Sequence, residues 1–435
     1  MIEIINIIYL FFAIFCIFSF PLNSVFINKN LKKYNYNIFE IYSLNIILIL
    51  SIFLFLSFFK FNILFVYYFF LGLSFLNLFF FDWKKFNNKI LILTTFLIIL
   101  TSYTLSISSY PYLEWDASVN WIFKVINFKN NFSFENLKNV PGVKEYPHIG
   151  TYLWAMFWKA SFFDYEHTGR IVLLFIYLTS FLTLISNVKL DDVKKILLFI
   201  FIIAIAFDNI LFSGYQEPLM FFLCIVFVIL TKKICSNQKL FLNYFFLILC
   251  SNLIIWTKNE GMFILIFLSF FILLKKEILY KHKIILLLTF IILILIKKNI
   301  FLYYFGNFFV GWEGYEIIKF SEFFSYEILQ RFPYLLFQVF ITFFKYPIYI
   351  LFILLLIIFS SKEKNLKNNY DYIFFFLINI AMAIAIFYFT NDHKWKFHSQ
   401  VGLDRMLYQT SGVYLIFARD FLQKIISNNK VKKLT

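Results

Sequence analysis

Long apolar runs recur along almost the whole chain, separated by short polar stretches. Each run has about 17–25 residues, which as an α-helix is enough to cross the ~30 Å hydrocarbon core of a bilayer. The chain is 62% hydrophobic and only 15% charged, whereas a soluble domain is about half apolar and a quarter charged. The sequence therefore predicts an all-α polytopic membrane protein embedded in the lipid bilayer.

The apolar runs predict about thirteen transmembrane helices. Several runs are short for a full crossing, so tilted or broken helices are expected. The first run lacks a basic leader and a small-residue cleavage site, so we interpret it as the first span. The predicted spans are 3–21, 40–59, 62–81, 89–108, 167–187, 193–209, 215–231, 240–256, 261–275, 282–300, 346–361, 370–390 and 405–425.

Lysine clusters between the spans predict the orientation. Basic loops favour the cytoplasmic side, and all the clusters fall on one side if the amphipathic segment near 322–344 lies along the outer surface without crossing. The N-terminus is then outside. The formal charge of +16 follows from this arrangement, and no nucleic-acid partner is expected. The clusters are Lys29/Lys32/Lys33, Lys84/Lys85/Lys89, Lys189/Lys194/Lys195, Lys232/Lys233, Lys275/Lys276/Lys281/Lys283, Lys362/Lys364/Lys367 and Lys430/Lys432/Lys433.

The opposite, outer face holds most of the residues whose side chains could take part in binding or catalysis. Seven of the eight tryptophans and four of the five histidines fall there, although neither residue type was used to choose the topology. The predicted organisation is an N-terminal membrane region, 1–108, with about four helices, an outer loop, 109–166, with short interfacial helices, and the remaining helices in 167–435. An aromatic belt at headgroup level explains part of the tryptophan enrichment.

The outer loop holds the candidate catalytic group. Glu114 and Asp116 lie between Trp115 and Trp121, and carboxylates beside flat aromatic faces are suited to a sugar. Carboxylates are costly near lipid unless they are paired or used. We predict that Asp116 is catalytic, with Glu114 beside it. Further along the same loop, Tyr146 and His148 are candidates for substrate binding, and Arg170 for phosphate binding.

Three later outer segments supply further candidates. Glu217 precedes Pro218, where it either caps a helix or belongs to the site. Lys258 either neutralises Glu260 or faces an anionic headgroup. A last segment combines basic residues in a way that departs from the positive-inside trend and suggests a bound phosphate, although Arg405 could instead pair only with Asp404 or with a neighbouring helix. The basic and polar candidates of that segment are His393, Lys394, Arg405 and Gln409.

These motifs together resemble the GT-C superfamily of polytopic glycosyltransferases, such as protein O-mannosyltransferases, the lipid A aminoarabinose transferase and Rgt-type enzymes. The resemblance rests on Asp116…Trp121…Lys124, Y-P-H-I-G-T-Y-L-W, G-Y-Q-E-P, W-T-K-N-E-G and L-D-R-M-L-Y-Q-T-S-G, spread over about 105–415. It implies a polyprenyl-phosphate sugar donor, transfer on the outer face and inversion. The chain departs from the family in having about four spans before the catalytic loop, where members usually have one.

The implied reaction transfers a sugar to an envelope acceptor at the extracytoplasmic face of a bacterial-type inner membrane. It needs one carboxylate base and cations that stabilise the leaving phosphate. The chain contains no nucleotide-binding glycine motif, which is consistent with a lipid donor. We expect no cofactor; a divalent metal held by Asp116, Glu114 and Glu217 is not favoured. The alternative functions are a transporter or flippase for a lipid-linked or anionic solute, and an O-antigen polymerase or ligase.

The predicted roles fall into three groups. The catalytic residues are Asp116 and Glu114, and the donor-phosphate ligands are Arg405, Lys394, His393, Lys258 and Arg170. The substrate-binding residues are Trp115, Trp121, Tyr146, His148, Glu217, Glu260 and Gln409.

Overall fold

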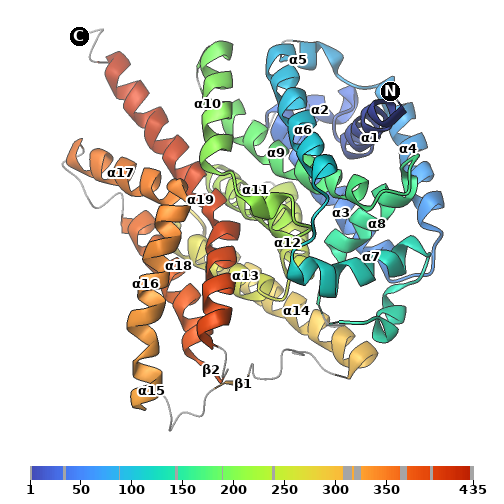
Figure 1. The fold of residues 1–435 in the computed structure, drawn as a ribbon. Helices are drawn as coiled ribbons and strands as arrows, with labels where there is room; N and C mark the ends of the chain where they lie inside the picture. Colours follow the sequence, from blue (N-terminus) through green and yellow to red (C-terminus); the bar gives the residue numbers. More distant parts are fainter. Residues whose placement is uncertain are drawn as a thin grey trace.

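The computed structural model describes residues 2–32, 36–87, 89–142, 146–188, 190–237, 241–306, 316–317, 325–362, 370–391 and 395–431. These residues form an assembly of α-helices (Figure 1). The described ranges contain one short antiparallel pair of strands, β1 (Glu316–Ile317) and β2 (Thr390–Asn391). The predicted all-α architecture is therefore confirmed at the level of fold class.

The N-terminal region contains four long apolar helices and two short ones. The long ones are α1 (Ile2–Ser19), α3 (Ile38–Ser57), α4 (Ile63–Leu78) and α6 (Ile90–Ser109), and the short ones are α2 (Val25–Lys32) and α5 (Trp83–Asn87). Asn37 begins α3 with a capping box, since its side chain accepts from the amide of Glu40 while the Glu40 carboxylate accepts from the amide of Asn37.

Short helical segments follow α6, in the region predicted to be the outer loop. They are the π-helix η1 (Ala117–Trp121), α7 (Ile122–Lys129), the 3₁₀ segment η2 (Phe134–Asn139), α8 (Ile149–Ala160) and the 3₁₀ segment η3 (Glu166–Arg170). None of α7, η2 and α8 is long enough to cross a bilayer by itself.

The rest of the chain returns to longer helices. They are α9 (Ile171–Ser186), α10 (Asp192–Ile205), α11 (Glu217–Ser236), α12 (Phe241–Thr257), α13 (Gly261–Leu274), α14 (Tyr280–Phe305), α16 (Arg331–Lys345), α17 (Pro347–Lys362), α18 (Tyr370–Tyr388) and α19 (Trp395–Val431), with the short segments η4 (Asn209–Leu211) and α15 (Tyr326–Leu329).

All thirteen predicted spans coincide with a helix, but fewer helices meet the requirements of a crossing. Six described helices are long and apolar enough to span a membrane, or seven if the bent pair formed by 326–345 and 347–358 counts as one span. Four further apolar helices have 10–17 residues. The structure therefore supports a membrane protein with six or seven clear spans.

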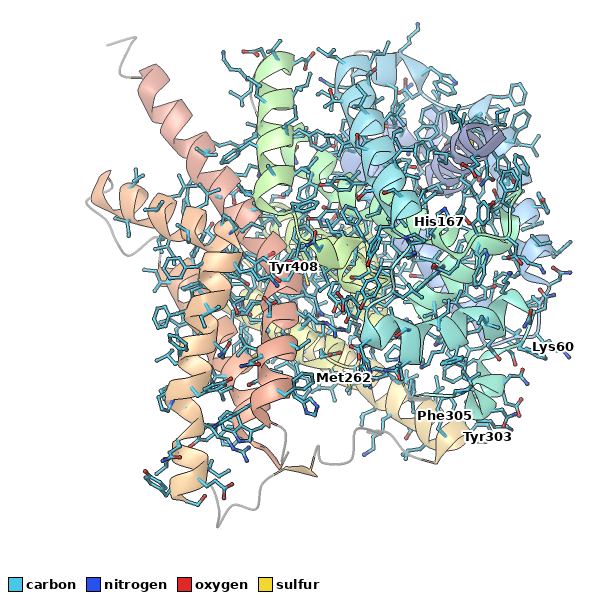
Figure 2. All side chains as sticks on the ribbon, in the orientation of Figure 1. Lys60, His167, Met262, Tyr303, Phe305 and Tyr408 are labelled. Atoms are coloured by element: carbon cyan, nitrogen blue, oxygen red, sulfur yellow. The ribbon has the colours of Figure 1, made fainter. Side chains whose placement is uncertain are left out.

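Burial separates central helices from peripheral ones. All of the 18-residue apolar window of the span at 166–186, which includes α9, is buried, whereas only 22% of that of α14 and 28% of that of α6 are buried. Around α9, Tyr408 of α19 donates to the Tyr177 hydroxyl at 2.9 Å, and Figure 2 places Tyr408 near the middle of the molecule. The apolar side chains left exposed on α6 and α14 are suited to contact with lipid.

The segment predicted to lie along the outer surface is helical. Helices α15 and α16 precede a bend of 89° at the junction with α17, and α16 packs against α17, α18 and α19. Tyr346 lies between α16 and α17 and Pro347 begins α17, so the missing proline amide accounts for a break at this point. That the segment does not cross the membrane stays a prediction.

Turns predicted to share a membrane face interact with one another. On the lysine-rich side, Lys89 pairs with Asp192 at 3.5 Å and Lys233 with Glu40 at 2.9 Å. On the other side, Asn6 donates to Ser161 at 2.9 Å, and β1 pairs with β2. These contacts join turns that the lysine pattern assigns to the same face.

Candidate functional site

The guanidinium of Arg405 is the centre of a polar cluster. Its Nη1 donates to the Asp116 carboxylate, and its Nε donates to Glu217 Oε1 at 2.6 Å. Arg405 lies on α19, Asp116 immediately before η1, and Glu217 at the start of α11. Residues separated by almost 300 positions in the sequence thus meet at one cation.

Glu217 is fully buried and accepts from several donors. Lys258 Nζ, in the turn between α12 and α13, lies 2.8 Å from Glu217 Oε1, and Gln409 Nε2 of α19 lies 3.4 Å from the same oxygen. The two carboxylates, Asp116 and Glu217, are balanced by Arg405 and Lys258. This balance makes burial tolerable, because an unpaired charge in the same place would be strongly destabilising. Glu217 also lies at a helix N-terminus, where negative charge is favoured.

A tight turn before α11 brings the two carboxylates together. Gly214 has a φ of +81°, and a Cβ there would lie 2.7 Å from Leu113 Cδ2, so a larger residue is excluded. The backbone amide of Glu114 donates to the Ser213 carbonyl at 3.1 Å. The loop before η1 is thereby attached to the loop before α11, and Asp116 is brought close to Glu217.

Asp116 also precedes an unusual helical segment. The chain from Ala117 to Trp121 forms a π-helix rather than an α-helix, and such single turns occur frequently at functional sites.

The ring of Tyr215 stacks against the guanidinium of Arg405, since the ring centroid lies 4.1 Å from Arg405 Cζ. This contact is a cation–π interaction.

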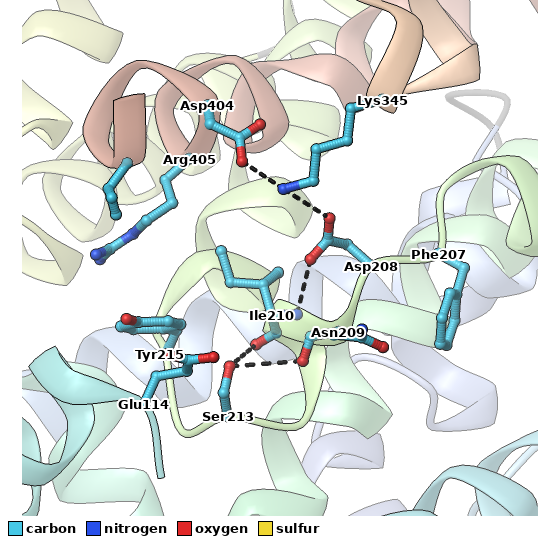
Figure 3. Close-up of a pocket in the computed structure, with 11 residues that line it drawn as sticks. Glu114, Phe207, Asp208, Asn209, Ile210, Ser213, Tyr215, Lys345, Asp404 and Arg405 are labelled. Carbon is cyan, nitrogen blue, oxygen red and sulfur yellow. Dashed lines mark hydrogen bonds and ion pairs between the residues drawn. The ribbon is translucent and has the colours of Figure 1, made fainter. Parts of the chain in front are cut away.

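A cavity of about 410 Å³ adjoins this cluster. Lys345, the last residue of α16, reaches into its wall, where it lies 3.5 Å from Asp208 and also pairs with Asp404 (Figure 3). The volume lies in the range of small-molecule sites. The cavity is lined by Glu114, Phe207, Asp208, Asn209, Ile210, Ser213, Tyr215, Lys345, Val401, Asp404 and Arg405.

Five of the predicted site residues form this cluster and a sixth lines the cavity. The five are Asp116, Glu217, Lys258, Arg405 and Gln409, and the sixth is Glu114, whose side chain is exposed. Glu260 lies at the margin, 3.6 Å from Lys258.

Arg170 belongs to a different cluster. It is almost fully buried, pairs with Glu166 at 2.9 Å and donates to the carbonyls of Tyr112 and Phe212 at 2.9 and 2.5 Å. These bonds tie η3 to the segments that follow α6 and α10. The structure therefore gives Arg170 an evident structural role.

The aromatic candidates of the outer loop differ in exposure to solvent. Trp115 is exposed, whereas Trp121 is buried against Tyr146 with ring centroids 5.3 Å apart. Lys124 lies over both of these rings and donates to the Tyr146 carbonyl at 2.6 Å. Trp121 and Tyr146 thus pack within the loop.

His148 is enclosed by apolar and aromatic groups. Its Nε2 lies 2.6 Å from the Ser57 hydroxyl, and rings of Phe134 and Trp256 surround it. Burial lowers the pKa of His148 well below its ordinary value, and the charges of Lys124 and Lys297 lower it further. His148 therefore remains a neutral imidazole at physiological pH.

Other expectations have mixed outcomes. Of the alternative partners considered for Arg405, Asp404 pairs with Lys345 instead, whereas Glu217 on the neighbouring helix α11 does bind Arg405. His393 and Lys394 lie outside the described residues. Within the described ranges, no group of three or more His, Cys, Asp or Glu residues could hold a metal.

Sequence reasoning missed Asp208, Tyr215 and Lys345 as parts of the site. Asp208 lies at the end of the predicted span 193–209, and Lys345 is a single cation inside an otherwise apolar stretch. A charge in such a position is costly without a partner, and this cost could have identified both residues as candidates. Their mutual proximity depends on the packing of α16 against α19.

Comparison with known proteins identifies no relative, because no family model, curated protein or solved structure matches the chain.

Proposed function

We propose that this protein is a GT-C-like membrane glycosyltransferase with about thirteen spans. It transfers a sugar from a polyprenyl-phosphate donor to an envelope acceptor, with inversion, on the extracytoplasmic face of a bacterial-type inner membrane. The observation that carries the proposal is the meeting of Asp116, Glu217, Lys258 and Arg405 beside a cavity. These side chains come from four separate outer segments.

The chemistry needs few groups. The acceptor oxygen forms a bond to the anomeric carbon while the bond from that carbon to the donor phosphate breaks, and the bonding electron pair leaves with the phosphate. The transition state has oxocarbenium character. A cation stabilises the charge that develops on the phosphate, and a carboxylate receives the proton of the acceptor hydroxyl. A phosphate leaving group needs no added proton.

The geometry supports separate roles for the two carboxylates. Glu217 has no exposed side-chain surface, whereas 17% of the Asp116 side chain is exposed. Only Asp116 is therefore placed to reach an entering hydroxyl. Glu217 and Lys258 hold Arg405 in position, and Arg405 receives the phosphate.

The cavity provides room for the sugar or the acceptor. Its lining combines carboxylates and hydroxyls with the rings of Phe207 and Tyr215. Hydroxyl-rich ligands use such acceptors for hydrogen bonds and such rings for stacking. The polyprenyl tail stays in the bilayer while its phosphate enters the site.

The decisive experiment is transfer of radiolabelled sugar from polyprenyl phosphate in membranes that contain each variant. Asp116→Asn keeps the shape but removes the base, so transfer should fall by about 10²–10⁴-fold. Glu114→Gln should cost less, because Asp116 is the carboxylate that is hydrogen-bonded to Arg405, the cation proposed to bind the phosphate. Asp164→Asn is the matched control, since Asp164 is an exposed carboxylate that pairs with Lys129 away from Arg405.

Normal transfer by Asp116→Asn together with a dead Glu114→Gln variant would assign the base to Glu114. Normal transfer by both, and by Arg405→Lys and Glu217→Gln, would refute the glycosyltransferase proposal. Movement of the lipid across the membrane without sugar transfer would favour the transporter alternative.

A further inference from the structure

We infer that Asp116 is the resident occupant of an anion site on Arg405, and that the donor phosphate displaces it before the acceptor reacts. The inference rests on the proposed function and adds an order of binding to it. It starts from the way in which the donors of the guanidinium are distributed.

Arg405 has one donor group to spare. Nε is bonded to Glu217 and Nη1 to Asp116, while Nη2 makes no hydrogen bond within the described residues. Nη2 is not one of the buried polar atoms that lack a partner, so this unbonded donor is accessible from outside the protein. Since Arg405 lines the cavity, Nη2 is the donor that an entering anion reaches first, and Figure 3 shows the guanidinium end of Arg405 beside Tyr215.

Phosphate binds arginine best through two parallel hydrogen bonds. To use Nη1 as well as Nη2, the phosphate must take the place of the Asp116 carboxylate. Asp116 is the weaker of the two competitors, because Arg405 is its hydrogen-bonding partner within the described residues, whereas Glu217 is held by Lys258 and Gln409 too.

Displacement has a chemical consequence. In the resting site, the Asp116 carboxylate accepts a hydrogen bond from Arg405, so it is held against the guanidinium and not against an entering hydroxyl. Once the phosphate occupies Arg405, the Asp116 carboxylate is free to accept the proton of the acceptor hydroxyl. Arrival of the donor thus switches on the base, and the donor binds before the acceptor.

The test measures binding of a polyprenyl monophosphate to purified full-length protein in nanodiscs of neutral phosphatidylcholine. Removing the competing carboxylate should tighten binding, so Asp116→Asn should bind about 10- to 100-fold more tightly than the natural protein, as expected for one charge-assisted hydrogen bond. Asp164→Asn should bind like the natural protein. If Asp116→Asn does not fold, Asp116→Ala tests the same point.

The outcomes separate this inference from the proposed function. Equal or weaker binding by Asp116→Asn overturns the displacement inference, even if the natural protein transfers sugar. Tighter binding without transfer from any polyprenyl-phosphate sugar supports the anion site and refutes the proposed enzyme. Inorganic phosphate that binds as tightly as the polyprenyl phosphate would overturn the lipid-linked part of the inference.

Ordered binding provides a second readout. In initial-rate experiments on the natural protein, the released polyprenyl phosphate should inhibit competitively against the donor and not against the acceptor. Competitive inhibition against the acceptor would overturn the proposed order.

Discussion

At the scale of single residues, Arg405 is the side chain that joins the parts of the site. It lies between two carboxylates on different segments, and its side chain is 11% exposed. A planar guanidinium can donate to both carboxylates and still present a third donor, whereas an ammonium group concentrates its charge at one point. Lysine, which carries the same charge, therefore cannot make all the hydrogen bonds that arginine makes at this position.

We therefore predict that Arg405→Lys lowers transfer by roughly 10²-fold, the usual cost of losing one donor that stabilises developing charge. The measurement is the radiolabel assay in membranes, with protein amounts normalised. Arg419→Lys is the control, because Arg419 lies on the same helix but pairs with Asp420 at 2.9 Å. Equal losses in both variants would show that the effect is not specific to the site.

The buried imidazole of His148 predicts a pH dependence of stability. Its pKa in the folded protein lies well below the ordinary value of 6.5, so below about pH 6.5 the unfolded chain binds a proton that the folded protein does not. Stability should decline as the pH falls from 7.5 to 5. His148→Phe should flatten this decline, measured as Tm in detergent at each pH. An unchanged slope would contradict the prediction.

At the scale of elements, the close packing of α11 against α19 keeps Arg405 beside Glu217. A Cβ at Gly412 would lie 2.9 Å from Ile225 Cδ1 and 3.1 Å from Phe221 Cζ, so the two helices approach closely there. Glycine allows this approach because it has no side chain. Two turns away toward the N-terminus of α19, the same helix presents Arg405.

Gly412→Ala should therefore destabilise the protein by about 1–3 kcal/mol, the typical cost of overpacking, and should reduce transfer. Gly72→Ala is the matched control, because nothing lies within 4 Å of a Cβ there. Alanine in a helix interior is favoured over glycine by about 0.5–1 kcal/mol, so this variant should be neutral or more stable. Thermal unfolding compares the two, and equal gains in Tm would contradict the packing argument.

At the scale of the whole molecule, the lysine clusters predict which ends of the helices lie outside. Lys138 of η2 and Lys194 of α10 are both exposed and lie on opposite predicted sides. In spheroplasts, an impermeant maleimide should label Lys138→Cys at once and Lys194→Cys only after permeabilisation. The natural cysteines are mostly buried, and the unmodified protein gives the background. Labelling of both positions from one side would refute the topology.

The sequence alone was sufficient for the helical class and for the approximate position of each long helix. Hydrophobic burial in lipid depends on local composition, so 40–59, for example, could be identified as a helix that the structure places at Ile38–Ser57. The candidate carboxylates Asp116 and Glu217 were also recognisable, because a charge at a membrane boundary needs a reason.

Only the tertiary structure decided which of these charges act together. Arg170 and Arg405 look alike in the sequence, yet one binds Glu166 and two backbone carbonyls while the other joins Asp116 and Glu217. Lys345 lines the cavity because α16 packs against α19, and Asp208, in the turn before η4, lies 3.5 Å from it. The physical reason is that a span is determined by its own residues, whereas an ion pair is determined by the distance between residues far apart in the chain.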